Sequence, residues 1–347
     1  MAKGTISIAF VDALLDGFRD RGLDTDELLE QVGLSSSLLT HSHARVSSAT
    51  YTILLRLIAQ VLDDEFFGHD SRRMKVGSFA LMAQGAVHCP TMERAFIWVL
   101  RSFALHLDDL RGTWLRRDGQ VIVRLCERQG DQPAKIFAQE TLLLFAHRLV
   151  CWLVNRRIPL LCAQFRYPRP AHHAEYALLF CPDVQFDQPA TSLSIDARHA
   201  ALPVVRTPED LKDFLTSVPE SLLLQYRDRQ GMTARILRRL RDCPPSDWPG
   251  FDQLADDLQI SSSTLRRRLE AEGQSYQSIK DQLRRDMAID LLSFSQLSVM
   301  DIAGELGFAE TSAFHRAFKK WTDANPGEYR RTVLQRRSSR QIAPMPG

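Results

Sequence analysis

The sequence predicts an α+β domain followed by an all-α domain, in which two helix-turn-helix motifs are joined by a long linker helix. Short strand patterns and turn signals alternate with helical patterns in the first part of the chain. Helical spacing is then nearly continuous, and one short pattern of two helices and a turn occurs twice. The predicted parts are an N-terminal domain, a helical linker, the all-α domain and a disordered tail, over residues 1–205, 206–231, 232–333 and 334–347.

Helical spacing dominates the beginning of the chain. Apolar residues three and four apart recur across residues 8–62, and Gly22 and Gly33 stand where helices are expected to end. The residues on the apolar faces are Phe10, Leu14, Leu15, Phe18, Leu28, Leu29, Val32, Leu54, Leu55, Ile58, Val61 and Leu62.

A hairpin and further short strands follow. The segments Thr113–Arg117 and Val121–Cys126 flank Asp118-Gly119, which is a strong signal for a two-residue hairpin turn. Additional strands are expected at Gln164–Tyr167, Val184–Phe186 and Ser192–Ile195, and helices at Phe137–Val154 and Glu175–Phe180. Pro208 opens the linker at a first helical position, and Gly231 closes it.

Composition is that of an ordinary soluble globular protein. The 347 residues are 44% hydrophobic and 25% charged, with a net charge of +2. Residues 245–347 hold 14 basic and 14 acidic residues, so nucleic-acid binding would depend on where the charges lie. No apolar run approaches 18 residues, and the N-terminus lacks a signal-peptide pattern. We therefore expect a cytoplasmic protein without a membrane partner.

The repeated pattern has the layout of a DNA-reading motif. In the first copy a short helix precedes a turn at Gln259–Ser261, and in the second copy the turn lies at Gly307–Ala309. Ala255 and Ala303 occupy positions where two helices must approach closely. The distance from Ala255 to Leu265 is one residue shorter than that from Ala303 to Phe314, so the second turn is longer.

Each second helix of the motif has an apolar inner face and a polar outer face. Leu265 and Leu269 in the first copy, and Phe314 and Phe318 in the second, repeat every four residues. Arginine suits bidentate contact with guanine, whereas Ser, Thr and His contact base edges or phosphates. The predicted base-facing residues are Ser263, Arg266, Arg267, Thr311, Ser312, His315 and Arg316.

A single helix pattern over Tyr276–Leu292 connects the two copies. Its 17 residues would span about 25 Å. That length suits two recognition helices, the second helix of each motif, placed about one DNA turn apart. Basic and hydroxyl side chains near the recognition helices are predicted to contact phosphates: Ser262, Arg268, Lys280, Arg284, Lys319 and Lys320.

Residues about 230–332 resemble the DNA-binding domain of the AraC/XylS family of bacterial transcription regulators. The matching positions are Leu254-Ala255, Ser261, Leu265, Arg267, Leu269, Gly273, Ile302-Ala303, Leu306-Gly307-Phe308, Phe314, Arg316, Phe318 to Trp321, Pro326 and Tyr329-Arg330. Asp323 departs from the family, where a Gly commonly follows Trp-Thr.

The first 205 residues resemble, more loosely, the ligand-sensing, arabinose-binding-type domain of a subgroup of these regulators. Among the similar features are Phe67-Gly68, Gly77-Ser78-Phe79, Thr91 to Ala95 and Phe165 to Pro170. The resemblance implies a homodimeric, effector-responsive activator of transcription. It also implies promoter DNA, RNA polymerase and an unidentified small molecule as partners.

Two alternatives remain open from the residues alone. In the first alternative the chain is an enzyme, or an interaction module that does not bind DNA, with a helical C-terminal appendage. It can also bind DNA with an N-terminal domain that only dimerises. No phosphate-loop, dinucleotide, nucleophile-elbow or metal-site motif is present, so no cofactor, metal or catalytic residue is predicted. The aromatic residues Phe79, Phe96, Trp98, Phe103 and Trp114 are expected in the core rather than around a ligand cavity.

Overall fold

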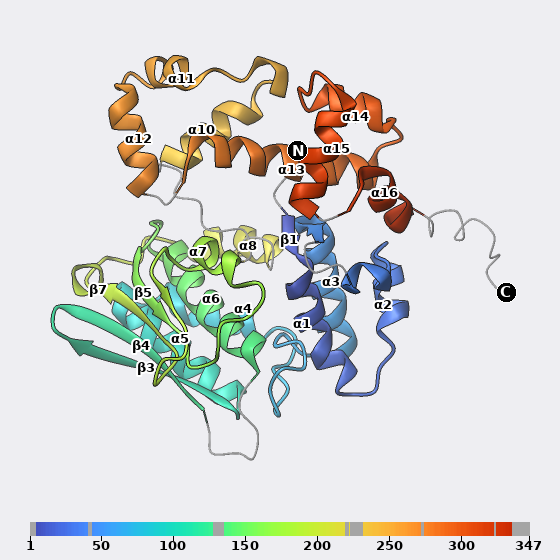
Figure 1. Cartoon of the computed structure of the whole chain (residues 1–347). Helices are drawn as coiled ribbons and strands as arrows, with labels where there is room; N and C mark the ends of the chain where they lie inside the picture. The colour runs from blue at the N-terminus through green and yellow to red at the C-terminus, as the bar shows by residue number, and fades with distance from the viewer. Residues whose placement is uncertain are drawn as a thin grey trace. The chain divides into compact units, whose positions relative to one another are not determined.

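The computed structural model describes residues 5–40, 44–127, 135–218, 222, 232–271, 274–322 and 324–334 (Figure 1). The chain forms two compact units. We call residues 1–11, 26–51 and 227–347 the helical unit, and residues 12–25 and 52–226 the sheet unit. The chain therefore passes between the units four times, after residues 11, 25, 51 and 226.

The sheet unit is built on a five-stranded sheet with the order β3-β4-β7-β5-β6. The strands are β3 (Leu110–Arg117), β4 (Gln120–Glu127), β5 (Leu160–Gln164), β6 (Val184–Gln185) and β7 (Ser192–Asp196). Only the β5–β6 pair is parallel. Asp118 and Gly119 have φ values of 50° and 72°, as a type I′ turn requires, so the predicted hairpin is confirmed.

The position of one predicted strand was wrong. The strand expected at Gln164–Tyr167 is β5 at Leu160–Gln164, which pairs with β7. Pro168 and Pro170 cannot donate ladder hydrogen bonds, so pairing lies upstream of them. Phe165 instead belongs to an aromatic cluster, with its ring centroid 5.0 Å from that of Tyr176.

Helices cover this sheet and fill the unit's core. The helices that lie wholly within this unit are α4 (Ser78–Val87), α5 (Met92–His106), α6 (Ile136–Leu153), α7 (Tyr176–Leu179) and α8 (Pro208–Ser217). Helix α6 has the length and hydropathy of a membrane span, but 83% of it is buried, as in the core helix of a globular protein. Thr207 and Asp210 form a capping box at the start of α8, where Pro208 was predicted to begin a helix. The rest of the predicted linker, apart from Leu222, lies outside the described residues.

Most of the aromatic residues expected in the core are there. Phe79, Phe96 and Phe103 are buried, and Trp114 is half-buried. Trp98 is 44% exposed, so its predicted place in the core was wrong. Its ring lies over Gly85 on the surface of α4, and its Nε1 donates to the Met82 carbonyl.

A close approach of two backbone segments shapes the sheet unit. Helix α1 (Ile8–Arg19) brings Gly17 against Phe67 and Gly68, and a Cβ at Gly17 would lie 2.1 Å from the Phe67 carbonyl oxygen. Phe67 and Gly68 both have positive φ. The Arg21 guanidinium donates to the carbonyls of Gly17 and Gly68 and joins the two segments.

The helical unit contains the predicted all-α region. Its helices are α10 (Met232–Arg241), α11 (Phe251–Asp257), α12 (Ser262–Ala271), α13 (Tyr276–Phe294), α14 (Val299–Glu305), α15 (Thr311–Thr322) and α16 (Pro326–Leu334). Helix α13 is the predicted long linker helix, two residues longer at its end than expected. Leu254, Leu265, Leu269, Ile279 and Leu283 belong to the core around α10 to α13.

A small N-terminal ribbon belongs to the same unit. Strand β1 (Thr5–Ser7) pairs with β2 (Arg45–Ser47), and α2 (Thr25–Gln31) lies between them in sequence. Strands of three residues carry too little periodicity to be seen in the sequence, and this ribbon was not predicted. Helix α3 (Ser48–Leu62) follows β2 directly, just as α1 follows β1.

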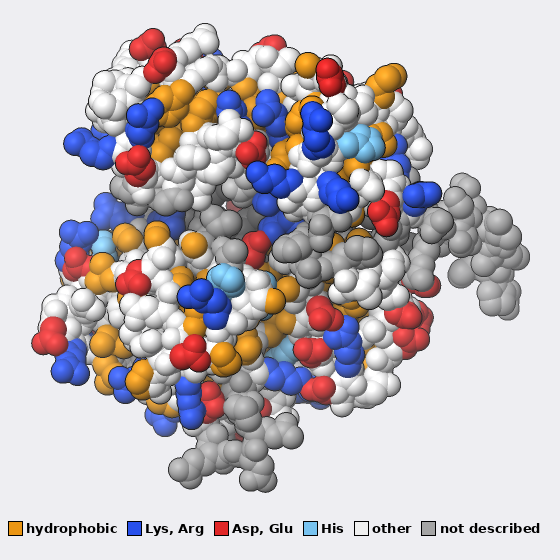
Figure 2. All heavy atoms as spheres, viewed as in Figure 1, with side chains coloured by type: hydrophobic (Ala, Val, Ile, Leu, Met, Phe, Trp, Pro, Cys, Tyr) orange, Lys and Arg blue, Asp and Glu red, His pale blue; other side chains and the backbone are white. Residues whose placement is uncertain are grey.

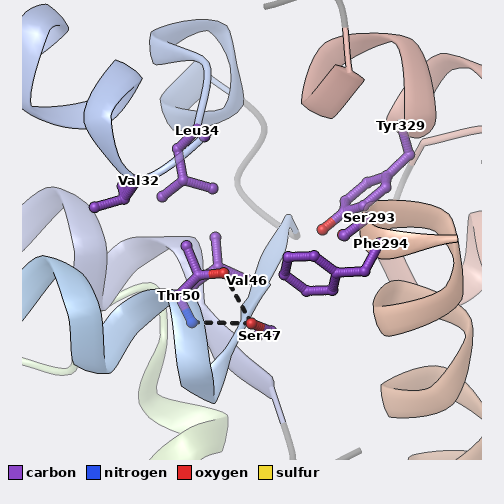
Figure 3. A pocket seen from close by; sticks show the side chains of 9 residues that line it. Val32, Leu34, Val46, Ser47, Thr50, Ser293, Phe294 and Tyr329 are labelled. Carbon is purple, nitrogen blue, oxygen red and sulfur yellow. Dashed lines mark hydrogen bonds between the residues drawn. The ribbon is translucent and has the colours of Figure 1, made fainter. Parts of the chain in front are cut away.

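The ribbon is attached to the helices by partly buried polar contacts. Thr5 Oγ1 donates to Asp286 Oδ1 on α13 at 2.8 Å, and Arg45 Nε donates to Thr5 Oγ1 at 2.9 Å. Beside these contacts lies a shallow pocket, drawn in Figure 3, in which Ser47 and Thr50 hydrogen-bond to each other. The pocket is lined by Val32, Gly33, Leu34, Val46, Ser47, Thr50, Ser293, Phe294 and Tyr329.

Candidate DNA-recognition surface

The first motif consists of α11, a short turn and α12. Gln259 adopts a left-handed φ of 56°, and the Ile260 N–H donates to the Ala255 carbonyl at 3.1 Å, which closes the turn. Ser261 Oγ then accepts from the Thr264 N–H at 3.2 Å, which caps α12. Ser262 Oγ donates to Asp252 Oδ1 at 2.6 Å and ties the two helices together.

The second motif, α14 to α15, uses the same closure. Gly307 has a φ of 72°, and the Phe308 N–H donates to the Ala303 carbonyl at 3.0 Å. In both copies the donor is therefore five residues after the buried Ala. Helix α15 begins eight residues after Ala303, whereas α12 begins seven after Ala255, which confirms the extra residue in the second turn.

The predicted apolar anchors of both recognition helices are buried. Leu265, Phe314 and Phe318 are fully buried, and Leu269 is nearly so. The opposite faces are open: Ser263, Arg266, Arg267, Ser312 and Arg316 are exposed, and Thr311 and His315 are half-buried. The Arg266 guanidinium lies 5.6 Å from the centroid of the Phe251 ring, at the first residue of α11.

The residues predicted to contact phosphates fall into two groups. Arg268, Lys319 and Lys320 are exposed. Ser262, Lys280 and Arg284 are half-buried and already have partners within the unit. Lys280 Nζ lies 4.6 Å from the Tyr276 ring centroid, and partial burial lowers the pKa of this ammonium group.

Figure 2 shows Lys and Arg side chains scattered among apolar ones on the surface of the helices that hold both motifs. A few acidic side chains lie among them, in keeping with the balanced charge of this part of the chain. The exposed basic residues of the recognition helices are Arg266, Arg267 and Arg268 on α12 and Arg316, Lys319 and Lys320 on α15. Arg239 and Asp257 form an ion pair, with their charged groups 3.4 Å apart, which engages one of the acidic groups of α11.

Three residues that sequence reasoning did not connect meet beside α13. The Arg284 guanidinium lies 5.0 Å from the Trp248 ring and 5.6 Å from the Phe308 ring. These residues are far apart in sequence and share no periodicity, so only the fold reveals the contact. Among the described residues no group of three or more His, Cys, Asp or Glu is placed to hold a metal ion. The family positions Gly273 and Asp323 lie outside the described residues.

Two helix-turn-helix motifs with buried anchors and arginine-bearing outer faces define a DNA-binding protein. Comparison with known families agrees. Residues 254–332 match a helix-turn-helix domain. Residues 22–204 match the N-terminal arabinose-binding domain of AraC transcription regulators. The chain belongs to the AraC family of transcription regulators. It is a DNA-binding regulator with an effector-binding type of N-terminal domain, and not an enzyme.

Some relatives align along most of the chain and others along a shorter segment alone. The ornithine utilization regulator of Pseudomonas aeruginosa is 27% identical over 326 residues, covering 94% of this chain and 96% of the relative. The urease operon transcriptional activator of Escherichia coli is 35% identical over 117 residues, covering 34% of this chain and 38% of its own. Among solved structures, the regulator CdpR of Pseudomonas aeruginosa covers 92% of this chain and 97% of its own, with 19% identity and a TM-score of 0.31.

Proposed function

We propose that this regulator is an effector-responsive activator that places α12 and α15 in two successive major grooves of promoter DNA. Base contacts come from Ser263, Arg266 and Arg267 in the first groove, and from Thr311, Ser312, His315 and Arg316 in the second. Exposed Arg268, Lys319 and Lys320 bind phosphates. The protein acts in the cytoplasm, at the nucleoid when it is bound to DNA.

The observation that supports this proposal most is the equivalence of the two motifs. The same five-residue closure and the same buried anchors leave one arginine-bearing face open on each recognition helix. Helix α13 connects them and has 19 residues, or about 28 Å at the α-helical rise. That length is close to the separation of about 34 Å between successive major grooves.

Residues 1–205 are proposed to bind the effector and to form a homodimer, and residues 206–231 to connect them with the DNA-binding residues 232–333. A ligand shifts only an equilibrium between states that it distinguishes, so the effector must favour the conformation with higher DNA affinity. The bound regulator then contacts RNA polymerase. Because one relative is named for ornithine utilization, we propose amino acids and their amine derivatives as the first effectors to screen.

A gel-shift titration tests DNA reading. The full-length protein first selects duplexes from a random library, and the selected duplex is compared with a scrambled one. Arg267→Ala or Arg316→Ala should weaken binding to the selected duplex by about 1–3 kcal/mol and relax sequence preference locally. Arg331→Ala, which removes an exposed arginine of α16, is the matched control and should leave both affinities unchanged. Equal losses on selected and scrambled duplexes would assign Arg267 or Arg316 to a phosphate.

Thermal-shift measurements test effector binding. An effector at 100 times its Kd should stabilise the folded protein by about 2.7 kcal/mol. A series of amino acids and amines that leaves the melting temperature unchanged, together with a dimer in sedimentation experiments, would favour an N-terminal domain that only dimerises.

A further inference from the structure

Arg284 occupies an unusual place for a basic residue on a DNA-binding helix. It lies in the middle of α13, and its Nε donates to the Leu306 carbonyl at 3.1 Å, at the end of α14. Its guanidinium also lies near the rings of Trp248 and Phe308. Burial lowers its pKa. The side chain thus contacts other residues of the protein, namely the Leu306 carbonyl and the rings of Trp248 and Phe308.

The two rings belong to opposite halves of the helical unit. Trp248 precedes α11, and its Nε1 donates to the Leu240 carbonyl of α10 at 2.8 Å. Phe308 lies in the turn of the second motif, with its ring centroid 5.5 Å from that of Phe314 on the recognition helix α15. A continuous row of contacts therefore runs from α10 through Arg284 to α15.

A second contact joins the same two halves. A Cβ at Gly307 would lie 3.1 Å from the carbonyl carbon and oxygen of Pro245 and 3.2 Å from the Ser246 nitrogen. The turn of the second motif therefore abuts the backbone just before the first motif. Since the contact is between backbones, it leaves little freedom to shift one half against the other.

We propose that Arg284 is a positioning residue that fixes the orientation of the second recognition helix relative to the first, and so sets the spacing of the DNA sequence that is read. This inference rests on the proposed reading of two grooves. It replaces the sequence-based prediction that Arg284 contacts a phosphate. A planar guanidinium can lie over two rings and donate through Nε at the same time, which a lysine ammonium cannot do.

The test uses the full-length protein and the duplex that it selects from a random library. Three further duplexes carry one base pair more between the half-sites, one base pair fewer, or a single intact half-site. Arg284→Met keeps the aliphatic stem but removes the guanidinium, and Arg284→Lys keeps the stem and the positive charge but loses the planar guanidinium. Arg331→Met, at an exposed position on α16, is the control for loss of a positive charge.

Arg284→Met should bind the single half-site like the wild type. Its affinity for the complete duplex should fall on the order of tenfold. The ratio of its affinity for the selected spacing to its affinity for the longer or shorter spacing should fall by a similar factor. Arg284→Lys should behave like Arg284→Met. The dependence of affinity on salt should keep its slope, because no phosphate contact has been removed.

A phosphate contact would give the opposite pattern. Arg284→Lys would then restore affinity, spacing discrimination would be intact in Arg284→Met, and the slope of log affinity against log salt would fall by about 0.9. Any of these results overturns the proposal. Failure of the two-groove proposal is recognised separately, because the wild type itself would then bind one half-site as tightly as two.

Phe308→Leu serves as a second probe if Arg284→Met melts before binding can be measured. It removes one ring from the row and keeps the guanidinium. In a double-mutant cycle the effects of Phe308→Leu and Arg284→Lys on spacing discrimination should be coupled. Independent, additive effects would show that the row of contacts does not set the spacing.

Discussion

The Tyr329 hydroxyl donates a hydrogen bond to the Arg45 carbonyl at 2.6 Å, across 284 positions of sequence. Tyr329 lies on α16 at the end of the DNA-binding helices, and Arg45 lies on the N-terminal ribbon. Tyr329 is 2% exposed, and its burial raises the pKa of the phenol, so the hydroxyl stays protonated and acts as a donor. This bond and the Thr5–Asp286 bond join the ribbon to α16 and α13.

Tyr329→Phe should lower the free energy of unfolding of the helical unit by about 1 kcal/mol, because it removes one buried hydrogen bond and keeps the ring. Amide exchange should report the change locally. The Ile8 N–H, which donates to the Ala44 carbonyl beside the ribbon, should exchange faster. Amides of β4 in the sheet unit serve as the internal control. Unchanged exchange at Ile8 would show that the ribbon is held by other contacts.

Asp290→Asn should stabilise the protein at neutral pH by about 1 kcal/mol, after allowance for partial exposure. Burial, with the nearby Asp286 carboxylate, raises the pKa of Asp290 to about 6. The folded state thus favours the protonated acid, and stability falls as pH rises from about 4 to about 6. The advantage of Asn should be absent at pH 4 and complete above pH 6.5, as measured by thermal unfolding.

Asp301 supplies the comparison for this pH effect. Hydrogen bonds from Ser298 lower the pKa of its carboxyl, within a capping box at the start of α14. Its contribution to stability is therefore present at neutral pH and lost as pH falls through the lowered pKa. Asp301→Asn should accordingly destabilise the protein at pH 7. If Asp290→Asn destabilises the protein at that pH, as Asp301→Asn should, the assignment for Asp290 is wrong.

Gly17→Ala should destabilise the sheet unit by about 1–3 kcal/mol, because the added methyl group meets the Phe67 backbone. Gly304 in α14 has open space around it, so Gly304→Ala should be neutral or stabilise its helix by up to about 1 kcal/mol. Chemical unfolding of both variants measures the difference. A tolerated Ala at Gly17 would mean that the approach of α1 to residues 67 and 68 is looser in solution.

Leu283→Pro should break α13 and cost about 3 kcal/mol or more, since proline removes a hydrogen bond and clashes with the preceding turn. Binding to a duplex with two half-sites should then lose its cooperation, with each half-site still bound separately. Leu283→Ala removes packing from the same buried position but keeps the helix continuous, so it should retain spacing discrimination. Cooperation that survives in Leu283→Pro would show that the two readers act independently.

Local patterns predicted much of this molecule. The Asp118-Gly119 turn, the buried helix α6 and the faces of α12 and α15 follow from turn chemistry and periodicity, which act over a few residues. The β1–β2 ribbon and the role of Arg284 depend on contacts between distant segments. Strand β5 was placed too late because the apolar residues Phe165 and Tyr167 continue the strand pattern but pack in an aromatic cluster.

The path of the chain limits which fragments of this regulator keep their native packing. A fragment that begins at residue 232 would contain both recognition helices but would lack Thr5 and Arg45, which hydrogen-bond to Asp286 and Tyr329 in the intact chain. Truncation would therefore leave a carboxylate and a phenol at a newly wetted surface, and activity assays on such a fragment would measure a differently packed protein.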